Sequence, residues 1–293
     1  MYNLLNQTKA IMQEFKNIIL MGKHKNYDLG GIVQKVGNYL SALQYNIFLD
    51  SETKENTTLD YPVAVESEKY DLVIVIGGDG TMIGAARKWG ILGIPLLGIN
   101  QGRVGFLTDI SSDDVFEGIS EILSGKFKRE ERNILNVSVI SNGKKVVYND
   151  IAINDLVCRS ATGKLMEFSL FLNDEFISSQ HADGIIVATS TGSTAYSLAA
   201  GGSIIHPDSE VLNIVPICPQ SLSNRPLVVS IHKQIKILFS GKEGVKYTAD
   251  GKDSPEITTG HYFLIKNNEK KIQLIHPSSY SYFEGLRKKL KWC

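Results

Sequence analysis

Apolar runs alternate with segments of helical spacing in the first part of the chain. The run Leu72–Ile76 is unbroken and mostly β-branched, which is typical of a strand covered on both faces. Further strands are predicted at 17–22, 46–49 and 94–100, and helices at 29–43, 81–89 and 111–124, the last with Ser111 or Ser112 as its N-cap. Strands separated by helices predict a parallel sheet.

The pattern changes after Gly125. Short alternating segments, separated by turn signals such as Ser141-Asn142-Gly143, predict strands at 135–140, 145–147, 167–172, 184–187, 227–229, 235–239 and 262–265. They indicate a β-sandwich or a related all-β domain. The tail at 280–292 returns to helical spacing, and its basic side chains are interpreted as a solvated face near a helix C-terminus. We therefore divide the chain into an α/β domain at 1–125, an all-β domain at 126–275 and a C-terminal segment at 276–293.

The composition and charge of the chain bear on its partners and its compartment. The chain has 293 residues, is 43% hydrophobic and 21% charged, and carries 31 basic and 31 acidic side chains. This balance is typical of a globular protein and gives no support to nucleic-acid or membrane-surface binding. The three cysteines are far apart, and the first residues do not have the pattern of a signal peptide. These observations predict a cytoplasmic protein with reduced thiols.

The glycine-rich turn that follows Leu72–Ile76 carries the strongest chemical signal. In Gly77-Gly78-Asp79-Gly80-Thr81 the glycines let the backbone turn sharply and approach a ligand, and the next helix points its free N–H groups at the turn. Such an arrangement binds phosphate. Because phosphate repels a carboxylate, Asp79 is interpreted as handling a metal ion or a proton in phosphoryl transfer. The alternative is a helix cap that binds nothing.

Two better-known phosphate-binding motifs do not fit. Each Gly-Lys pair, for example Gly163-Lys164, lacks the following hydroxyl residue of a Walker A loop. The dinucleotide fingerprint needs a third glycine three residues after the second, whereas Gly84 lies four residues after Gly80. The turn is therefore a different motif.

Two other segments carry candidate chemistry. Asn154 and Asp155 are adjacent polar residues after an apolar stretch, and they can read an adenine edge and accept from ribose hydroxyls or amides, or simply form a turn. The strand at 184–188 runs into a loop of hydroxyls, Thr189–Tyr196, then a short helix. Hydroxyls and free amides at a helix start can hold a nucleotide, and Tyr196 can stack on a ring. The alternative is a Ser/Thr-rich loop with N-capping.

Together these segments resemble the NAD kinases of the bacterial type. Gly77–Thr81 matches the family's glycine-aspartate motif, Asn154-Asp155 its Asn-acidic motif and Thr189–Tyr196 its hydroxyl-rich loop. Gly105–Asp109 and the closing Leu286–Trp292 also fit, so the resemblance covers about residues 15–293. The first motif is shared with diacylglycerol-kinase-like and phosphofructokinase-like proteins, whereas the hydroxyl-rich loop is more specific.

The resemblance implies a fold and a reaction. The fold would be a Rossmann-like N-terminal domain, a β-sandwich C-terminal domain that binds NAD, and a C-terminal helix that returns to the first domain. The reaction would transfer the γ-phosphate of ATP to the 2′-hydroxyl of the adenosine ribose of NAD, with Mg²⁺ or Mn²⁺. No metal ligand is assigned to the protein itself. Family members are homodimers or homotetramers, so a homo-oligomer without nucleic-acid or membrane partners is expected.

The resemblance also implies roles for individual residues. Asp79 is expected to accept the proton of the ribose hydroxyl. Phe106 is expected near the adenine, and Asp183 near the nicotinamide end, where it can reach a neighbouring subunit. The full set of expected nucleotide-binding residues is Gly78, Gly80, Thr81, Phe106, Asn154, Asp155, His181, Asp183, Thr191, Gly192, Ser193, Thr194, Ala195 and Tyr196.

Three positions depart from the family pattern, and two other functions remain open. Ser190 stands where proline is usual, His181 where some members carry a basic side chain, and Ala199 where some have serine, so no contact is assigned to Ala199. One alternative is a lipid kinase of the diacylglycerol-kinase type, although no exposed apolar segment suggests bilayer access. The other is a catalytically silent NAD-binding sensor.

Overall fold

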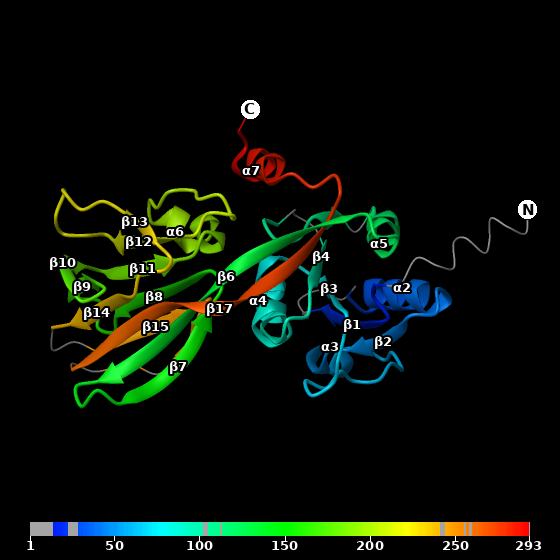
Figure 1. Cartoon of the computed structure of the whole chain (residues 1–293), viewed down its shortest axis with the longest axis horizontal. Helices are drawn as coiled ribbons and strands as arrows, with labels where there is room; N and C mark the ends of the chain where they lie inside the picture. The colour runs from blue at the N-terminus through cyan, green and yellow to red at the C-terminus, as the bar shows by residue number, and fades with distance from the viewer. Residues whose placement is uncertain are drawn as a thin grey trace, which may run out of the picture. The chain divides into compact units, whose positions relative to one another are not determined.

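The structure, a computed structural model, describes residues 14–22, 29–101, 105–111, 113–240, 244–254, 256–257 and 260–292. It divides into two compact units. The first consists of Met1–Glu130 and Ile272–Cys293, and the second of Glu131–Lys271. Figure 1 labels most of the helices and strands of both. The predicted N-cap Ser112 lies outside the described residues.

The first unit is built on a parallel sheet. Its strands β1 (Asn17–Gly22), β2 (Asn46–Leu49), β3 (Leu72–Ile76) and β4 (Leu96–Asn100) have the order β4-β3-β1-β2. Every neighbouring pair is parallel. The end of β17 (His261–Pro277) joins β4 in parallel, pairing Leu274 with Leu96, and β5 (Ile110–Ser111) pairs with the other end of β4. The predicted parallel sheet is confirmed.

Helices cover both faces of this sheet. Helices α2 (Leu29–Ala42) and α5 (Val115–Leu123) pack through residues such as Val36 and Ile119 on the face that Leu20 and Ile74 present. Successive strand residues point to opposite faces, so the neighbouring Met21 serves the other face. There it meets α4 (Asp79–Lys88), beside Gly84. The unit also contains α3 (Ser51–Glu55) and η2 (Gly90–Leu92), which the apolar pattern did not predict.

Two helix starts were predicted wrongly. Helix α4 begins at Asp79 rather than Thr81, because Gly78 serves as its N-cap. Ser111 is part of β5, and Asp114 is the residue that precedes α5. In both cases the apolar periodicity of the helix was read correctly, but the residue at which the helix begins was not.

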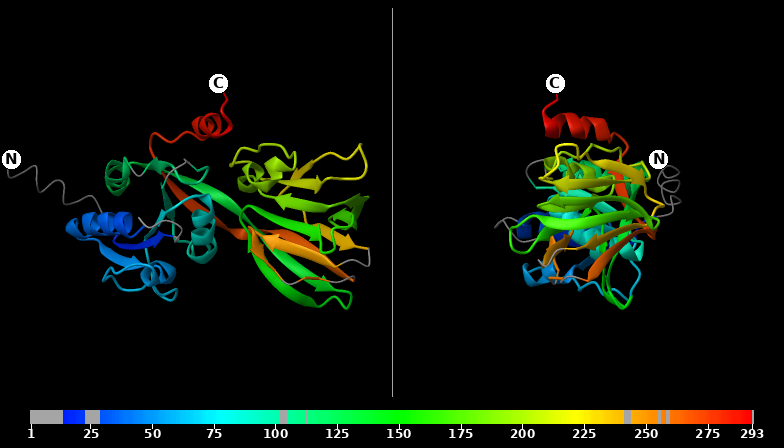
Figure 2. Two further views of the ribbon diagram at one scale, coloured as in Figure 1. Left: turned by 180° about the vertical axis from the view of Figure 1, so that it is seen from behind. Right: turned by 90° about the vertical axis from the view of Figure 1, so that its left-hand side faces the viewer.

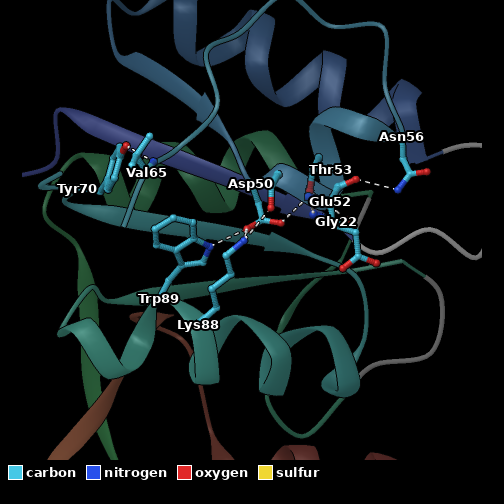
Figure 3. A network of polar contacts seen from close by, with 10 residues as sticks. Gly22, Asp50, Glu52, Thr53, Asn56, Val65, Tyr70, Lys88 and Trp89 are labelled. Atoms are coloured by element: carbon cyan, nitrogen blue, oxygen red, sulfur yellow. Dashed lines mark hydrogen bonds and ion pairs between the residues drawn. The ribbon is translucent and has the colours of Figure 1, made fainter. Parts of the chain in front are cut away.

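A buried carboxylate connects β2 to α4 (Figure 3). Asp50, only 1% exposed, accepts hydrogen bonds from Lys88 Nζ at 2.6 Å and from Trp89 Nε1 at 2.9 Å. It also caps α3 by accepting from the amide of Glu52 at 3.1 Å. One turn further, Thr53 donates to and accepts from the backbone of Gly22. Because these contacts satisfy a buried charge, they fix α3 and α4 against the sheet.

The second unit is a sandwich of two antiparallel layers (Figure 2). One layer is a six-stranded sheet of order β13-β12-β11-β8-β15-β16, and the other contains β10-β9-β14-β17, with β6 paired to β17 and to β7. A single core fills the space between them, with Val137, Phe168, Val187 and Tyr247 among its members. The strands are β6 (Phe127–Ser141), β7 (Val146–Ala152), β8 (Asp155–Ser160), β9 (Met166–Leu172), β10 (Glu175–Ala182), β11 (Gly184–Ala188), β12 (Val211–Ile217), β13 (Leu227–Ser230), β14 (Ile235–Phe239), β15 (Val245–Ala249) and β16 (Lys252–Asp253).

The chain passes between the units within two long strands, β6 and β17. The C-terminal helix α7 (Tyr282–Leu290) then belongs to the first unit, where Lys128 Nζ donates to the carbonyl of Tyr280 at 2.9 Å. Ser281 caps α7 by accepting from the amide of Glu284. The predicted fold class, with an α/β part, a β-sandwich and a returning C-terminal helix, is confirmed. Within the described ranges, none of the helices has the length and apolarity needed to cross a bilayer.

Candidate active site

Asp79 lies at the N-terminal turn of α4, directly after the buried strand β3. Its Oδ2 accepts from the amide of Phe106 at 2.8 Å, and its Oδ1 from the amide of Leu107 at 3.0 Å. The side chain is half-buried, so it remains accessible from solvent. Asp79 therefore presents a carboxylate whose direction is fixed by two backbone amides of a loop distant in sequence.

The glycines around Asp79 fall into two groups. Packing explains why Gly105 and Gly77 are glycines. A Cβ at Gly105 would lie 2.0 Å from Asp79 Oδ1, and a Cβ at Gly77 would lie 2.5 Å from Thr81 Oγ1. In contrast, a Cβ at Gly78 or Gly80 would meet no atom of the described residues within 4 Å. Both of these residues are exposed. The fold itself therefore does not exclude a side chain at either position, which favours a ligand that comes close to the backbone there.

Asn154 and Asp155 are held by a residue that the sequence did not single out. Asp250 accepts from the amides of Ile153 at 2.9 Å, Asn154 at 2.6 Å and Asp155 at 3.2 Å. It lies with Gly251 at the turn between β15 and β16, and both have positive φ, of 54° and 74°. Asp-Gly is a frequent hairpin turn, so the sequence signals the turn but not the carboxylate's contacts. Asn154 stays half-buried, and Asp155 is buried.

The hydroxyl-rich loop packs directly on this pair. Thr189 donates its hydroxyl to the carbonyl of Ile153 at 2.6 Å and its amide to the carbonyl of Asn154 at 2.9 Å. Ser193 donates to the carbonyl of Ser190 at 2.6 Å and accepts from a second backbone amide. The hydroxyls of Thr189 and Ser193 therefore stabilise the loop by hydrogen bonds to the backbone. The loop contains η3 (Thr191–Thr194), in which Thr191 and Thr194 stay half-buried and the hydroxyl of Thr194 donates to the carbonyl of Thr191 at 3.3 Å. It leads to α6 (Tyr196–Ala199), the predicted short helix.

Gly192 is the point of closest approach between the two motifs. A Cβ there would lie 2.0 Å from the carbonyl oxygen of Asn154. We expect Gly192→Ala to force the loop away from Asn154 and to destabilise the protein by about 1–3 kcal/mol. Gly143→Ala is the control, since the nearest atom of the described residues would lie 3.9 Å from its Cβ. Urea unfolding measures the change, and equal stability of the two variants would contradict the prediction.

The carboxyl of Asp155 has an unusual acidity. Burial, together with the nearby charge of Asp250, raises the pKa of Asp155 from 3.8 to about 7. Between these two values the folded protein holds a proton that the unfolded chain has lost. The stability that this protonated group contributes is complete below 3.8 and is lost as the pH rises through about 7.

This linkage gives a pH-dependent prediction. We expect the free energy of unfolding of the wild type to fall, relative to that of Asp155→Asn, as the pH rises from 3.8 to about 7. Urea unfolding at a series of pH values measures the difference. Asp60→Asn is the control, because Asp60 is fully exposed and its difference from the wild type should stay flat. A flat difference for Asp155→Asn as well would show that the folded carboxyl is not perturbed.

The remaining predicted residues lie along the edge of the same unit. His181 is an exposed residue of β10, and Asp183 is an exposed residue between β10 and β11. The guanidinium of Arg159 covers the ring of Tyr196, with Cζ 4.8 Å from the ring centroid. This is a cation–π contact, which sequence spacing could not reveal because Arg159 lies on β8 and Tyr196 on α6. Stacking of Tyr196 on a ligand ring stays a prediction.

The candidate residues therefore form one group in each unit. Asp79, with Gly78, Gly80, Thr81 and Phe106, lies in the first unit. The second unit holds the other predicted residues, and there the structure brings Asn154, Asp155 and the hydroxyl-rich loop into contact.

Comparison with known proteins identifies the family. The ATP-NAD kinase N-terminal domain matches residues 24–127, and the ATP-NAD kinase C-terminal domain matches residues 153–277. The NAD kinase of Thiobacillus denitrificans is 39% identical over 286 residues, covering 95% of this chain and 97% of its own. The chain belongs to the NAD kinase family. The NAD kinase of Nitrosomonas europaea is also 39% identical, over 283 residues and 95% of each chain.

Solved structures of the NAD kinase family share the fold. Yeast NADH kinase, complexed with NADH, superposes with a TM-score of 0.86 at 23% identity, covering 96% of this chain and 89% of its own. An NAD kinase from Archaeoglobus fulgidus, in complex with ATP, gives a TM-score of 0.69 at 24% identity and covers 94% of this chain and 98% of its own.

Proposed function

We propose that this member of the NAD kinase family transfers the γ-phosphate of ATP to the 2′-hydroxyl of the adenosine ribose of NAD, which gives NADP and ADP. Family membership supports the reaction. The observation that carries the mechanism is the carboxylate of Asp79, held by the amides of Phe106 and Leu107 beside two glycines that the fold does not require.

Asp79 would act as the general base. A ribose hydroxyl is a poor nucleophile at neutral pH, so its proton must leave as the new P–O bond forms. A carboxylate fixed by two amides can accept that proton without first reorienting. The N-terminal turn of α4, with Gly78 and Gly80 open in front of it, would bind a phosphate group of the nucleotide.

The second unit would hold NAD. The half-buried Asn154 has an amide that can donate to and accept from a purine edge. The hydroxyl of Thr191 can donate without adding charge, and that of Thr194, which donates to the carbonyl of Thr191, can still accept. Ser193 would act on the loop's shape rather than by direct contact, since its hydroxyl already has two backbone partners. The remaining predicted contacts, including Ala195, His181 and Asp183, are part of the same proposal.

A divalent cation would enter with ATP. Among the described residues no group of three or more His, Cys, Asp or Glu side chains is arranged to hold a metal ion. Mg²⁺ is commonly bound through substrate phosphates and one or two carboxylates rather than by an all-protein cage. Mg-ATP is therefore the proposed donor, and the cation would neutralise charge on the transferred phosphoryl group.

One assay tests the function. The protein is incubated with Mg-ATP and NAD, and NADP is detected with an NADP-specific dehydrogenase. Formation of NADP in proportion to enzyme supports the proposal. NAD binding without NADP would contradict it and indicate a sensor, and phosphorylation of a lipid but not of NAD would indicate a lipid kinase.

The proposal includes a homo-oligomer, because the family resemblance places Asp183 where it can reach a neighbouring subunit's site. A closed symmetric assembly is the usual solution for such enzymes. Light scattering under assay conditions measures the mass, and a monomer would contradict this part. A cytoplasmic location stays a prediction from the sequence.

A further inference from the structure

His276 lies near the end of β17 and is almost completely buried between two carboxylates. Its Nδ1 is hydrogen-bonded to Asp109, and its Nε2 lies 3.1 Å from Glu130 Oε2. The ring is 1% exposed and stacks on Tyr280, with centroids 3.9 Å apart and planes 11° apart. Three segments distant in sequence therefore meet at one imidazole, within the first unit.

The carboxylates favour the charged form of this ring. A neutral imidazole has one N–H donor and one acceptor, so one of the two carboxylates would face a lone pair. An imidazolium donates to Asp109 through Nδ1 and forms an ion pair with Glu130, whose Oε2 lies 3.1 Å from Nε2. Burial of the ring lowers the pKa of His276, but the hydrogen bonds and charges of Asp109 and Glu130 outweigh burial and raise the pKa above its ordinary value.

Three other charged groups lie near this cluster, and one of them, Lys128, donates its Nζ to the carbonyl of Tyr280 at 2.9 Å. Glu284 and Lys288 of α7 line the same pocket of about 180 Å³ as Asp109 and Tyr280. They form an ion pair with each other at 2.7 Å. The ionisable groups that shift the pKa of His276 are Asp109, on the loop before β5, and Glu130, on β6.

Asp109 belongs to the loop that orients Asp79. Phe106 and Leu107 donate their amides to the Asp79 carboxylate, and Thr108 accepts from Asn100 Nδ2 at 2.8 Å. The loop is therefore attached to Asp79 by its first residues and to the buried imidazole by Asp109. A change in charge at His276 acts on the loop through this second attachment.

We propose that His276, as an imidazolium, is a positioning residue that fixes the 105–109 loop and thereby the direction of the Asp79 carboxylate. The inference rests on the proposed function, because it assigns Asp79 as the base. Loss of the proton removes the positive charge that attracts the carboxylates of Asp109 and Glu130, and this loosens the attachment of the loop. A base misplaced by about 1 Å can lower a rate by about 100-fold.

The pH profile of kcat is the decisive readout. We expect the wild type to lose kcat as the pH rises through the pKa of His276, and His276→Gln to have a lower kcat without this alkaline limb. A purely structural role would lower kcat equally at every pH. The control is His232→Gln, since His232 is exposed and pairs with one carboxylate, Glu210, at 3.2 Å. It should reproduce the wild-type profile.

Asp109→Asn provides a second variant in case His276→Gln does not fold. It removes one of the two charges that raise the pKa of His276, so the alkaline limb should move to lower pH. Thermal melts establish that each variant is folded. A limb at the wild-type position in Asp109→Asn, or a limb retained in His276→Gln, would overturn the inference.

An independent measurement does not need activity. The chain has six histidines, and comparison with His276→Gln assigns the ring resonances of His276 in an NMR titration. We expect the ring of His276 to stay charged to a higher pH than an ordinary histidine does. A ring that titrates at or below the ordinary histidine pKa would overturn the inference even if the enzyme forms NADP. Failure of the wild type to form NADP would instead contradict the proposed function.

Discussion

Replacing Asp79 with asparagine is expected to lower kcat by about 10²–10⁴-fold, the usual contribution of a general base, while NAD still binds. The substitution keeps the size of the side chain and removes the basic lone pairs and the charge. The hydroxyl proton then has no acceptor as the P–O bond forms. Titration calorimetry measures NAD binding, and initial rates at saturating NAD and Mg-ATP measure kcat.

The structure supplies a matched control for this substitution. Asp71 precedes β3 and also accepts two backbone amides, those of Lys16 at 2.9 Å and Asn17 at 2.7 Å. Asp71→Asn disturbs the same kind of contact in the same unit without touching the glycine-rich turn. We expect its kcat to stay near that of the wild type. An Asp79→Asn enzyme with normal kcat would return Gly77–Thr81 to the status of a structural turn.

A second possibility for Asp79 can be separated in the same experiment. If its carboxylate acts chiefly by holding Mg²⁺, raising the Mg²⁺ concentration should recover part of the lost activity of Asp79→Asn. If it acts as the base, added Mg²⁺ leaves kcat low. Recovery to the wild-type rate would contradict the assignment of Asp79 as the proton acceptor.

Replacing Asp50 with alanine is expected to lower the free energy of unfolding by about 3–5 kcal/mol, the range for breaking a buried ion pair. The side chain of Asp50 is 1% exposed, and that of Lys88 is 31% exposed. The variant leaves Trp89 Nε1 buried without its acceptor, and it removes the cap of α3. Because three contacts share one carboxylate, they are lost together. Urea unfolding measures the change.

The comparison for this variant is an exposed ion pair nearby in sequence. Asp60 lies 3.9 Å from Lys54 and is fully exposed. Exposed pairs contribute about 0.2–1 kcal/mol, so Asp60→Ala should unfold almost as the wild type does. If both variants lost the same small amount of stability, the buried network in Figure 3 would not be fixing α3 and α4.

The sequence predicts an element well where one local signal dominates. The unbroken run at Leu72–Ile76 is β3 as observed, and the predicted strand at 17–22 matches β1. In β6 the prediction covered only 135–140, although the strand runs from Phe127 to Ser141. Its first residues are mostly charged, and their pairing depends on strands that lie far away in sequence. Local alternation cannot show such pairing.

The candidate site shows the same contrast between residues with a local sequence signal and residues that depend on distant contacts. Asp79 could be selected from sequence because glycines surround it in a strand-to-helix turn. Asp250 could not, because its contacts with Asn154 and Asp155 cross almost a hundred residues. Asp50 and His276 were missed for the same reason. Their burial and their contacts distinguish them, and neither property can be read from the residue type alone. The residues that hold the site together are less visible in sequence than the residues that would do its chemistry.

The first unit is discontinuous along the chain, and this has a consequence for biosynthesis. The edge of β4 pairs with Leu274 and Ile275, and Ile275 is part of the core around Leu20 and Val36. A ribosome therefore releases the strand that completes the first unit only after the whole second unit has been synthesised. Until then the nascent sheet has an open edge, a template for pairing with other chains. Folding during synthesis therefore finishes when this late strand pairs with β4 and completes the core of the N-terminal sheet.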